Sequence, residues 1–510
     1  MKKTTAILLS LLWAISLCAQ TAYSTLGAEH EVRVNSNGSI GINLQSLAPA
    51  SFYNKDSTKP LLAQAGLWLV AEDENGQYHT AVQYLSGKDS FDFWPGPIDT
   101  LTGQTGDISA WDATWYVSND IITTHKQNFE KPGYNIPDEI ANWPAQGNGG
   151  FANYLAPFVD VNFNKTYDPE NGDYPAIKGA ESVYCIFNDL ADEHTASFGQ
   201  EIGIEIQLMV YKPAGASTLF LEYFIINRRP IAYKKIQVGF FISGGCGNPD
   251  DNFAGTLQTF PQSIFILNGL DTDQGYFSNK TPYVVATFLN ENLTNSIAFT
   301  DTELKNGQPK TNSDYLNYGL NIWKDGTNLT WGGDGTEEDT ESDFIFAQSN
   351  LTEGIFWSED DENNTPGRRT IIGKNTRKNF NQNNFIKLDI ALDVGLLNDR
   401  KKYLDSITLK SARSLSYYNA TSGIPTADIN NNFRVYPNPT SGPLYMHSDQ
   451  VIEEIIITDS QGVKVYSSEN IKHTRWRCNV SLLPGIYTIQ LITKSNVQSK
   501  KILYEYYIII

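Results

Sequence analysis

Apolar residues at every second position are the feature that most constrains how this chain folds. Residues 202–210 carry isoleucine, leucine or valine at each even position, and residues 386–394 repeat the pattern. A period of two buries one face of a β-strand and leaves the other face polar. Residues 219–226 are apolar on both faces except at Glu222, which predicts a central strand covered on both sides.

Shorter apolar runs at 238–242, 263–267 and 283–289 predict further strands. The 39 glycines and 22 prolines interrupt such runs throughout the chain, and no long segment combines helical periodicity with helix caps. We therefore predict a mainly-β fold with a large β-sandwich-type body.

The two ends of the 510-residue chain differ from this body. Residues 1–19 join two lysines to an apolar stretch that is too short to cross a bilayer, which predicts a cleaved signal peptide and no transmembrane span in the mature chain. Residues 20–410 form the body, as one unit or as two subdomains. Residues 411–432 are rich in Ser, Asn, Ala and Thr and predict a linker, after which residues 433–510 form a small C-terminal unit.

Net charge excludes two kinds of partner. Lys and Arg number 38 and Asp and Glu number 57, so the formal net charge is −19. Because neutralising phosphates requires a basic surface, we expect neither nucleic-acid binding nor docking on anionic lipid.

The C-terminal unit combines a turn-rich opening with strand–turn–strand patterns. Prolines fix the backbone angle φ, and glycines permit tight turns. The residues that carry the pattern are Tyr436, Pro437, Asn438, Pro439 and Gly442 in the opening, Gly462 in the next turn, Pro484, Gly485 and Tyr487 in a later turn and strand, and the basic pair Lys500 and Lys501 near the end.

These motifs, in this order, resemble the type A C-terminal sorting domain of the type IX secretion system of Gram-negative bacteria. The resemblance implies a small immunoglobulin-like β-sandwich, the secretion machinery as a partner, and export through the periplasm and outer membrane. It also implies removal of the domain at the outer membrane, followed by release of the protein or attachment to surface lipopolysaccharide. The alternative is an ordinary C-terminal β-domain that binds sugar or protein.

The body is similar to the large surface proteins of unknown activity that often carry this domain. The similarity covers most of residues 60–395 and includes segments 92–97, 111–115, 155–160 and 323–327. It implies a secreted or cell-surface location and indicates no mechanism.

One loop has the side chains that calcium prefers. Lys165 stands where related loops have glycine, and Asn171 stands where an EF-hand has its glutamate. Since Ca²⁺ takes about six to eight oxygen ligands, the segment is either a calcium loop or a solvated loop of Asx turns. The candidate ligands are Asp160, Asn162, Asn164, Thr166, Asp168 and Asp173.

Cysteine and histidine give one weak pair of catalytic candidates. His194 precedes Cys246 at a spacing similar to that of caspase-like proteases, in which a histidine activates the thiolate. The signature residues of that family are absent around both positions. Removing Cys18 with the signal peptide leaves three cysteines, and the sequence does not determine whether two of them pair.

Tryptophans beside Gly, Pro and Asp favour sugar-stacking surfaces, although aromatic residues more often anchor a core. We predict a secreted cell-surface protein whose body binds a glycan or protein ligand, in adhesion or in a surface structure, without catalysis. The alternative is an extracellular hydrolase acting on glycans or peptides, because sequence spacing does not reveal paired carboxylates. The tryptophans concerned are Trp68, Trp94, Trp111, Trp115, Trp143, Trp323, Trp331 and Trp357.

Overall fold

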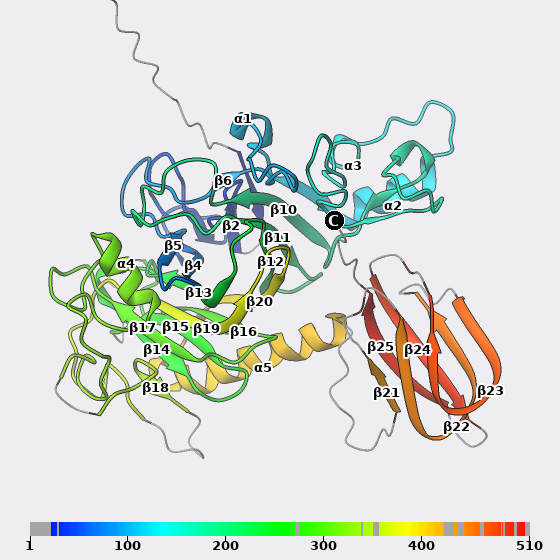
Figure 1. Ribbon diagram of the computed structural model, residues 1–510. Helices are drawn as coiled ribbons and strands as arrows, with labels where there is room; N and C mark the ends of the chain where they lie inside the picture. The colour runs from blue at the N-terminus through cyan, green and yellow to red at the C-terminus, as the bar shows by residue number, and fades with distance from the viewer. Residues whose placement is uncertain are drawn as a thin grey trace, which may run out of the picture.

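The computed structural model describes most of the chain, and its mainly-β architecture confirms the predicted fold class (Figure 1). The predicted signal peptide and residues 423–432 of the predicted linker lie outside the described residues. The described residues are 22–27, 30–270, 276–337, 340–349, 356–422, 433–436, 440, 443–459, 464–480, 482, 485–493 and 497–504.

Two β-sheets form the body, and nearly all of their neighbouring strands are antiparallel. The larger sheet has, in order, β18 (Ala347–Gln348), β14 (Asn252–Leu257), β15 (Ser263–Asn268), β16 (Thr281–Phe288), β20 (Phe385–Leu397), β12 (Leu219–Asn227), β11 (Ile204–Lys212), β10 (Glu181–Asn188) and β6 (Trp94–Pro95), with β7 (Trp115–Ser118) also paired to β10. The smaller sheet has β17 (Asn295–Phe299), β19 (Thr370–Phe380), β13 (Tyr233–Ser243), β4 (Gln64–Asp73) and β5 (Tyr78–Val82). Shorter sheets join β1 (Tyr23–Leu26), β2 (His30–Asn35) and β3 (Ser51–Tyr53), and β8 (Phe158–Val159) with β9 (Tyr174–Pro175).

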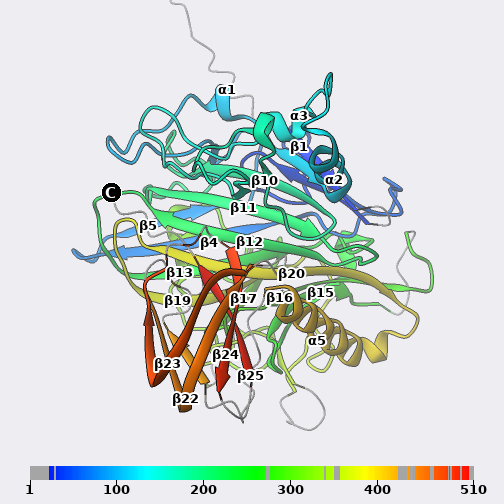
Figure 2. The ribbon, with the colours of Figure 1, turned by 90° about the vertical axis from the view of Figure 1, so that its right-hand side faces the viewer.

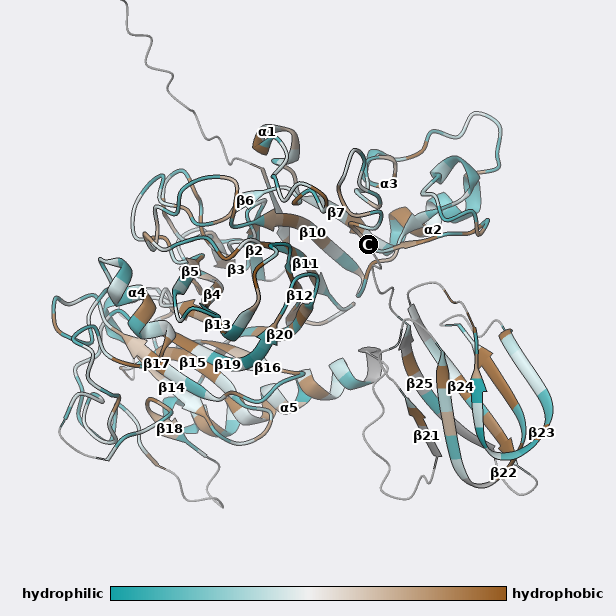
Figure 3. Cartoon of the chain, viewed as in Figure 1, coloured by the Kyte–Doolittle hydropathy of each residue, from teal (hydrophilic) through white to brown (hydrophobic). Residues whose placement is uncertain are grey.

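The two body sheets face each other across one hydrophobic core. Ile206 and Leu208 of β11 are fully buried in it, together with Trp68 of β4 and Phe240 of β13. The alternation in residues 202–210 therefore marks a strand with one face in the core, as predicted. Figure 3 shows hydrophobic residues concentrated on the body strands and hydrophilic residues on the connecting loops.

The outer face of the larger sheet is covered as well. β12 lies between β11 and β20, and all of its residues except Phe224 are buried, which confirms the predicted central strand. A second cluster, which includes Tyr184 and Tyr418, packs on this outer face. The polar side chains on that face are consequently buried too: Glu205 is fully buried and pairs with Arg228 at 2.8 Å.

Helix α5 (Tyr403–Ser422) corrects two predictions. Residues 411–422, predicted to belong to a linker, are its second half, and its 20 residues contradict the expectation that long helices are missing. In Figure 2 the helix lies beside the strands of the larger sheet. Hydroxyl groups make up most of its buried face, so the apolar periodicity that reveals a helix in a sequence is weak here. The buried face consists of Ile407, Ser411, Ser414 and Tyr418.

The remaining helices are short and lie in the connections between strands. None of the helices in the described part is long and apolar enough to span a membrane. They are α1 (Ile108–Trp111), α2 (Asn119–Asn128), α3 (Asp138–Ala141), α4 (Asn312–Gly319) and the 3₁₀ helices η1 (Pro169–Asn171), η2 (Pro249–Asp251) and η3 (Arg400–Lys402).

A separate curled sheet follows α5 (Figure 1). It has a hydrophobic core of its own, to which β22 and β24 contribute Ile455, Ile457, Ile489 and Leu491. This agrees with the small β-sandwich predicted for the C-terminal unit. Its strands are β21 (Phe433–Tyr436), β22 (Leu444–Thr458), β24 (Gly485–Thr493) and β25 (Val497–Tyr504) in order, with β23 (Lys464–Cys478) paired to β22.

Candidate functional site

The predicted calcium loop connects β8 to β9 and is held in shape by its own carboxylates. Asp160 is buried and accepts hydrogen bonds from the backbone N–H groups of Asn164 and Lys165, at 3.2 and 2.7 Å. Asp173 is fully buried and accepts from the N–H group of Asp168 at 3.0 Å. The carboxylates at the two ends of the loop therefore fix the backbone between them.

Three amide side chains converge on the carboxylate of Asp168. Their donor distances are 3.1 Å for Asn162, 2.7 Å for Asn164 and 2.8 Å for Asn171. Burial acts to raise the pKa of Asp168, but these hydrogen bonds outweigh it and the pKa is lowered. Thr166 is exposed, and its N–H group donates to the side-chain oxygen of Asn164 at 2.7 Å.

Asp173 has the opposite shift, because burial and the neighbouring carboxylate of Asp168 raise its pKa to about 6.

Lys165 has a φ of 66°, in the left-handed region where related loops have glycine. No group of three His, Cys, Asp or Glu side chains that could hold a metal occurs in the described ranges. The candidate metal ligands of the loop are all oxygen atoms, several of them from amide side chains, which fits calcium chemistry. The calcium site stays a prediction.

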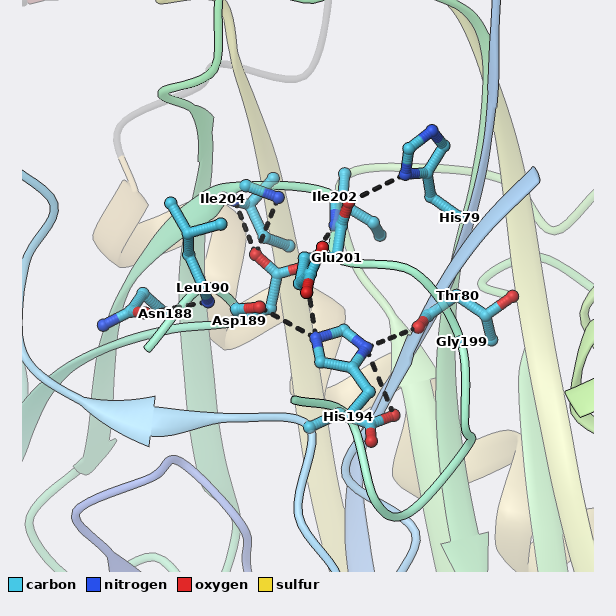
Figure 4. A network of polar contacts seen from close by, with 12 residues as sticks. His79, Thr80, Asn188, Asp189, Leu190, His194, Gly199, Glu201, Ile202 and Ile204 are labelled. Atoms are coloured by element: carbon cyan, nitrogen blue, oxygen red, sulfur yellow. Dashed lines mark hydrogen bonds and ion pairs between the residues drawn. The ribbon is translucent and has the colours of Figure 1, made fainter. Parts of the chain in front are cut away.

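His194 is enclosed among buried strands and loops (Figure 4). Its Nδ1 lies 2.8 Å from the carbonyl oxygen of Thr80, and its Nε2 lies 2.8 Å from the carbonyl oxygen of Asp189. Because a carbonyl oxygen only accepts, both ring nitrogens donate and the imidazole is protonated. The carboxylates of Asp92 and Asp189 lie 3.9 and 3.8 Å from these nitrogens. Burial acts to lower the pKa of His194, but the two carboxylates and the carbonyls outweigh burial and raise it.

The same two carboxylates also tie neighbouring strands together. Asp189 accepts hydrogen bonds from the N–H groups of Ile202 and Ile204, at 2.6 and 2.7 Å. Asp92 accepts from the N–H group of Val82 at 2.9 Å. The cluster around His194 is therefore part of the framework that holds β5 and β11 in place.

The structure does not bring His194 and Cys246 together as base and nucleophile. Both nitrogens of His194 are donors, so neither can accept a proton from a thiol. Cys246 is fully buried, and its Sγ donates to the carbonyl oxygens of Leu61 and Ile266, at 3.4 and 3.6 Å. The cysteines in the described part, Cys185, Cys246 and Cys478, are all buried, and no disulfide joins any two of them.

Most of the tryptophans anchor the core rather than a surface. Trp331 is 36% exposed and packs against Trp357, with ring centroids 5.0 Å apart. Those that are at most 4% exposed are Trp68, Trp94, Trp143, Trp323 and Trp357.

A groove opens where the chain passes from the larger sheet to the smaller one and, later in the sequence, back again. The β16–β17 connection makes one passage and the β19–β20 connection makes the other, and hydrogen bonds join them side by side. A cavity of about 480 Å³ and another of about 420 Å³ share Asn290, Glu291 and Arg377 in their linings. We call these two cavities the crossing groove. Phe260 in the first cavity is 62% exposed, and Phe385 in the second is 44% exposed.

Amide groups hold the two passages together. Asn290 donates from Nδ2 to the carbonyl oxygen of Lys387 and accepts at Oδ1 from the N–H group of Asp389, both at 2.9 Å. Glu291 and Arg377 form an ion pair in the part that both cavities share. The walls of the groove are therefore fixed by side chains that belong to both passages.

Asn375 of β19 lines the first cavity and has a buried acceptor that is unused. The residue is 6% exposed and lines that cavity. Its Nδ2 donates to the carbonyl oxygen of Asn292, which fixes the orientation of the amide. Its Oδ1 is buried and has no hydrogen-bond partner among the described residues. A buried unpaired carbonyl costs about 1–3 kcal/mol, so a donor from a ligand would be favourable at this atom.

Charged side chains lie at the inner end of the second cavity. Lys387 lies 2.8 Å from Glu222 and 3.2 Å from Asp389, and the hydroxyl of Tyr418 donates to Asp389 at 2.5 Å. Burial acts to raise the pKa of Glu222, but the charges of Lys178 and Lys387 lower it to about 2. Burial dominates at Asp389, whose pKa is raised.

Sequence reasoning did not find the crossing groove. The signals present in the sequence are Glu222, the one charge in an apolar strand, and the amide-rich turn at 379–384. Neither signal indicates that the two passages lie side by side, because that depends on long-range strand pairing.

The sorting motif follows the C-terminal sheet where the structure describes it. Tyr436 ends β21 and is 50% exposed, Gly485 and Tyr487 lie in β24, and Lys500 and Lys501 lie in β25. The motif residues outside the described part are Pro437, Asn438, Pro439, Gly442, Gly462 and Pro484.

The chain thus consists of a large β-body and a C-terminal β-domain that has a hydrophobic core of its own. Residues 434–505 match the family model described as the secretion system C-terminal sorting domain, which confirms the predicted type IX sorting domain. The protein is therefore a type IX secretion substrate, exported to the cell surface or the extracellular space, and the secretion machinery is its partner.

Two further comparisons concern the chain as a whole. No curated protein matches the chain. Among solved structures, one similar chain is titled a polysaccharide lyase, with 8% sequence identity and a TM-score of 0.20. The match covers 59% of this chain and 34% of that one, so this chain spans about a third of that protein's length.

Proposed function

We propose that the body is a non-catalytic binding module that acts outside the cell, in adhesion or in a surface structure. Export by the sorting domain supports this, because it delivers the body to a place where its ligands are extracellular. The signal peptide at 1–19 and passage across the outer membrane belong to the same proposal.

The observation that carries the proposal is the crossing groove. It combines exposed aromatic side chains with fixed polar side chains, which is the usual composition of a ligand site. Asn375, which lines the first cavity, has in addition a buried Oδ1 without a hydrogen-bond partner among the described residues.

The buried titratable groups support binding over catalysis. The protonated ring of His194 has both nitrogens occupied by carbonyl oxygens. The carboxylates of Glu222 and Asp389 are both paired with Lys387. Groups held in this way stabilise the fold and are not poised to exchange protons with a substrate.

One observation favours the alternative, an extracellular hydrolase. Glu222 and Asp389 are directly opposite each other on β12 and β20, and their pKa values are shifted in opposite directions. Such a pair is what acid–base hydrolysis of glycans requires. Only Asp389 of the two lines the second cavity, which is why binding is the preferred function.

A retention and product-release assay separates the two functions. The purified protein is passed over immobilised glycans and immobilised peptides, and the flow-through is analysed for released products by mass spectrometry. A binding module is retained without releasing products. Release of products that Asp389→Asn abolishes would instead identify a hydrolase.

Calcium belongs to the proposed function as a structural cofactor. The oxygen donors of Asp160, Asp168 and Asp173, with those of Asn162, Asn164 and Thr166, would hold the ion. Burial, and to a smaller extent the carboxylate of Asp168, raise the pKa of Asp173, and a cation beside the two carboxylates would act against both effects. After removal of the sorting domain, we propose release of the body or its attachment to surface lipopolysaccharide.

A further inference from the structure

We infer that the crossing groove binds a glycan chain, with a sugar unit in each of its two cavities. This inference rests on the proposed function, since it names the ligand of the proposed binding module. It follows from the aromatic ends of the groove, its polar centre and the strand pairing around it.

Each cavity has its own exposed phenylalanine. Phe260 is more than half exposed in the first cavity, and Phe385 is nearly half exposed in the second, where its ring lies 5.7 Å from that of Phe224. Large apolar side chains that remain this exposed, beside a hollow, mark a contact surface. The apolar face of a sugar ring is a flat partner for such a side chain.

The centre of the groove is suited to hydroxyl groups. Glu291 offers carboxylate acceptors and Arg377 offers planar donors, and both cavities share this ion pair. Asn375 adds the unpaired buried Oδ1, which needs a donor. A hydroxyl group can donate and accept at once, so neighbouring hydroxyls of one sugar can satisfy all three kinds of group.

Strand pairing makes a peptide ligand less suitable. Extended peptides usually bind by adding a strand to a free sheet edge. Beside the groove, the pairing of β19 with β17 ends at Lys374 and the pairing of β20 with β16 ends at Ile390. The β16–β17 connection lies along β20 there: Leu289 donates its N–H group to the carbonyl oxygen of Asp389, and the side chain of Asn290 bonds to the backbone of Lys387 and Asp389. A peptide could therefore add a strand to β20 at the groove only by displacing this connection.

The test compares substitutions at the groove with a matched substitution elsewhere. Affinities of the full chain for soluble oligosaccharides of cellulose, xylan, chitin and starch are measured by calorimetry, alongside a casein peptide digest. The variants are Phe260→Ala, Phe385→Ala and Glu291→Gln. Phe198→Ala is the control, because Phe198 is 59% exposed and is not among the residues that line the groove.

We expect at least one of these glycans to bind, and each groove variant to weaken its binding by about tenfold, which corresponds to ~1.4 kcal/mol. The control should bind as the unchanged protein does, and the melting temperatures of all variants should remain close to it. Glycan binding that the groove variants leave unchanged would overturn the inference while the binding function stands. Binding of peptides alone, lost in Phe260→Ala, would replace the glycan with a peptide. If calorimetry detected binding of neither ligand, and the retention assay described above detected released products, the inference and the proposed function would both be overturned.

Discussion

The ring of His194 lies against two different atoms of Asp189: its Nε2 is 2.8 Å from the backbone carbonyl oxygen and 3.8 Å from the carboxylate of the same residue. With Thr80 on the opposite nitrogen, this arrangement keeps a charged imidazole in a fully buried place. Burial alone would expel that charge, so the surrounding oxygens must outweigh it.

His194 should therefore make stability depend on pH. Its folded-state pKa is raised above the unfolded value of about 6.5, so its contribution is complete below about pH 6.5 and is lost as pH rises through the folded-state pKa. His194→Gln should lower the free energy of unfolding by about 3–5 kcal/mol in mildly acidic buffer, because two buried carboxylates lose their counter-ion. The loss should be smaller in alkaline buffer.

Urea unfolding at several pH values checks this prediction. His473→Gln, which changes an exposed histidine of β23, is the control and should have little effect at any pH. An equal loss of stability for His194→Gln in acidic and alkaline buffer would show that the ring is neutral in the folded protein.

Helix α5 should depend on hydroxyl groups for its attachment to the larger sheet. Ser414 donates from Oγ to the buried carboxylate of Asp393 at 2.7 Å. Ser414→Ala should lower the free energy of unfolding by about 2 kcal/mol, because a buried carboxylate loses a donor. Ser416→Ala, two residues further along the same helix at an exposed position, should change it by less than about 0.5 kcal/mol. Equal effects of the two substitutions in chemical unfolding would contradict the docked helix.

Calcium should stabilise the loop between β8 and β9. If the ion binds, calcium at about 100 times its Kd should add about 2.7 kcal/mol to the free energy of unfolding, and a chelator should reverse the effect. Asp168→Asn should abolish the response in a thermal melt. Asp325→Asn, which changes an acidic turn residue outside this loop, should leave the response intact. A melting temperature that is the same in calcium and in chelator would argue for a solvated loop of Asx turns.

Deleting residues 433–510 should trap the protein in the periplasm, because the sorting domain is removed. Cell fractionation and immunoblotting check this. The trapped body should melt as the full chain's body does, since α5 and both body sheets precede the deletion. Arrival of the truncated protein at the cell surface would show that the body carries its own export signal.

Local patterns in the sequence were enough for the strands and for the sorting domain. The alternation at 204–210 and the apolar run at 219–226 each lie within a single strand. The buried positions of these strands can therefore be read from a short segment of sequence alone. The turn-and-strand motif of the sorting domain that includes Gly485 and Tyr487 is also a local pattern, because its residues are close together in the sequence.

Other features depend on contacts between distant residues and were not predictable. Serines form much of the buried face of α5, because Asp393 and the hydroxyls of the sheet offer them partners. The crossing groove depends on Asn290 meeting Lys387, which are far apart in the chain. The spacing of His194 and Cys246 favoured a catalytic pair, whereas Thr80 and Asp189 occupy both ring nitrogens of the histidine.

The docked position of α5 determines what a proteolytic cut in this part of the chain would expose. Ser411, Ser414 and Tyr418 close the outer face of the larger sheet, and the helix ends at Ser422, ahead of the C-terminal sheet. A protease that cut before Tyr418 would strip this cover and leave Asp389 and Asp393 open to solvent. A cut after the helix would leave the outer face of the larger sheet covered. The body would then not have to refold after the cut.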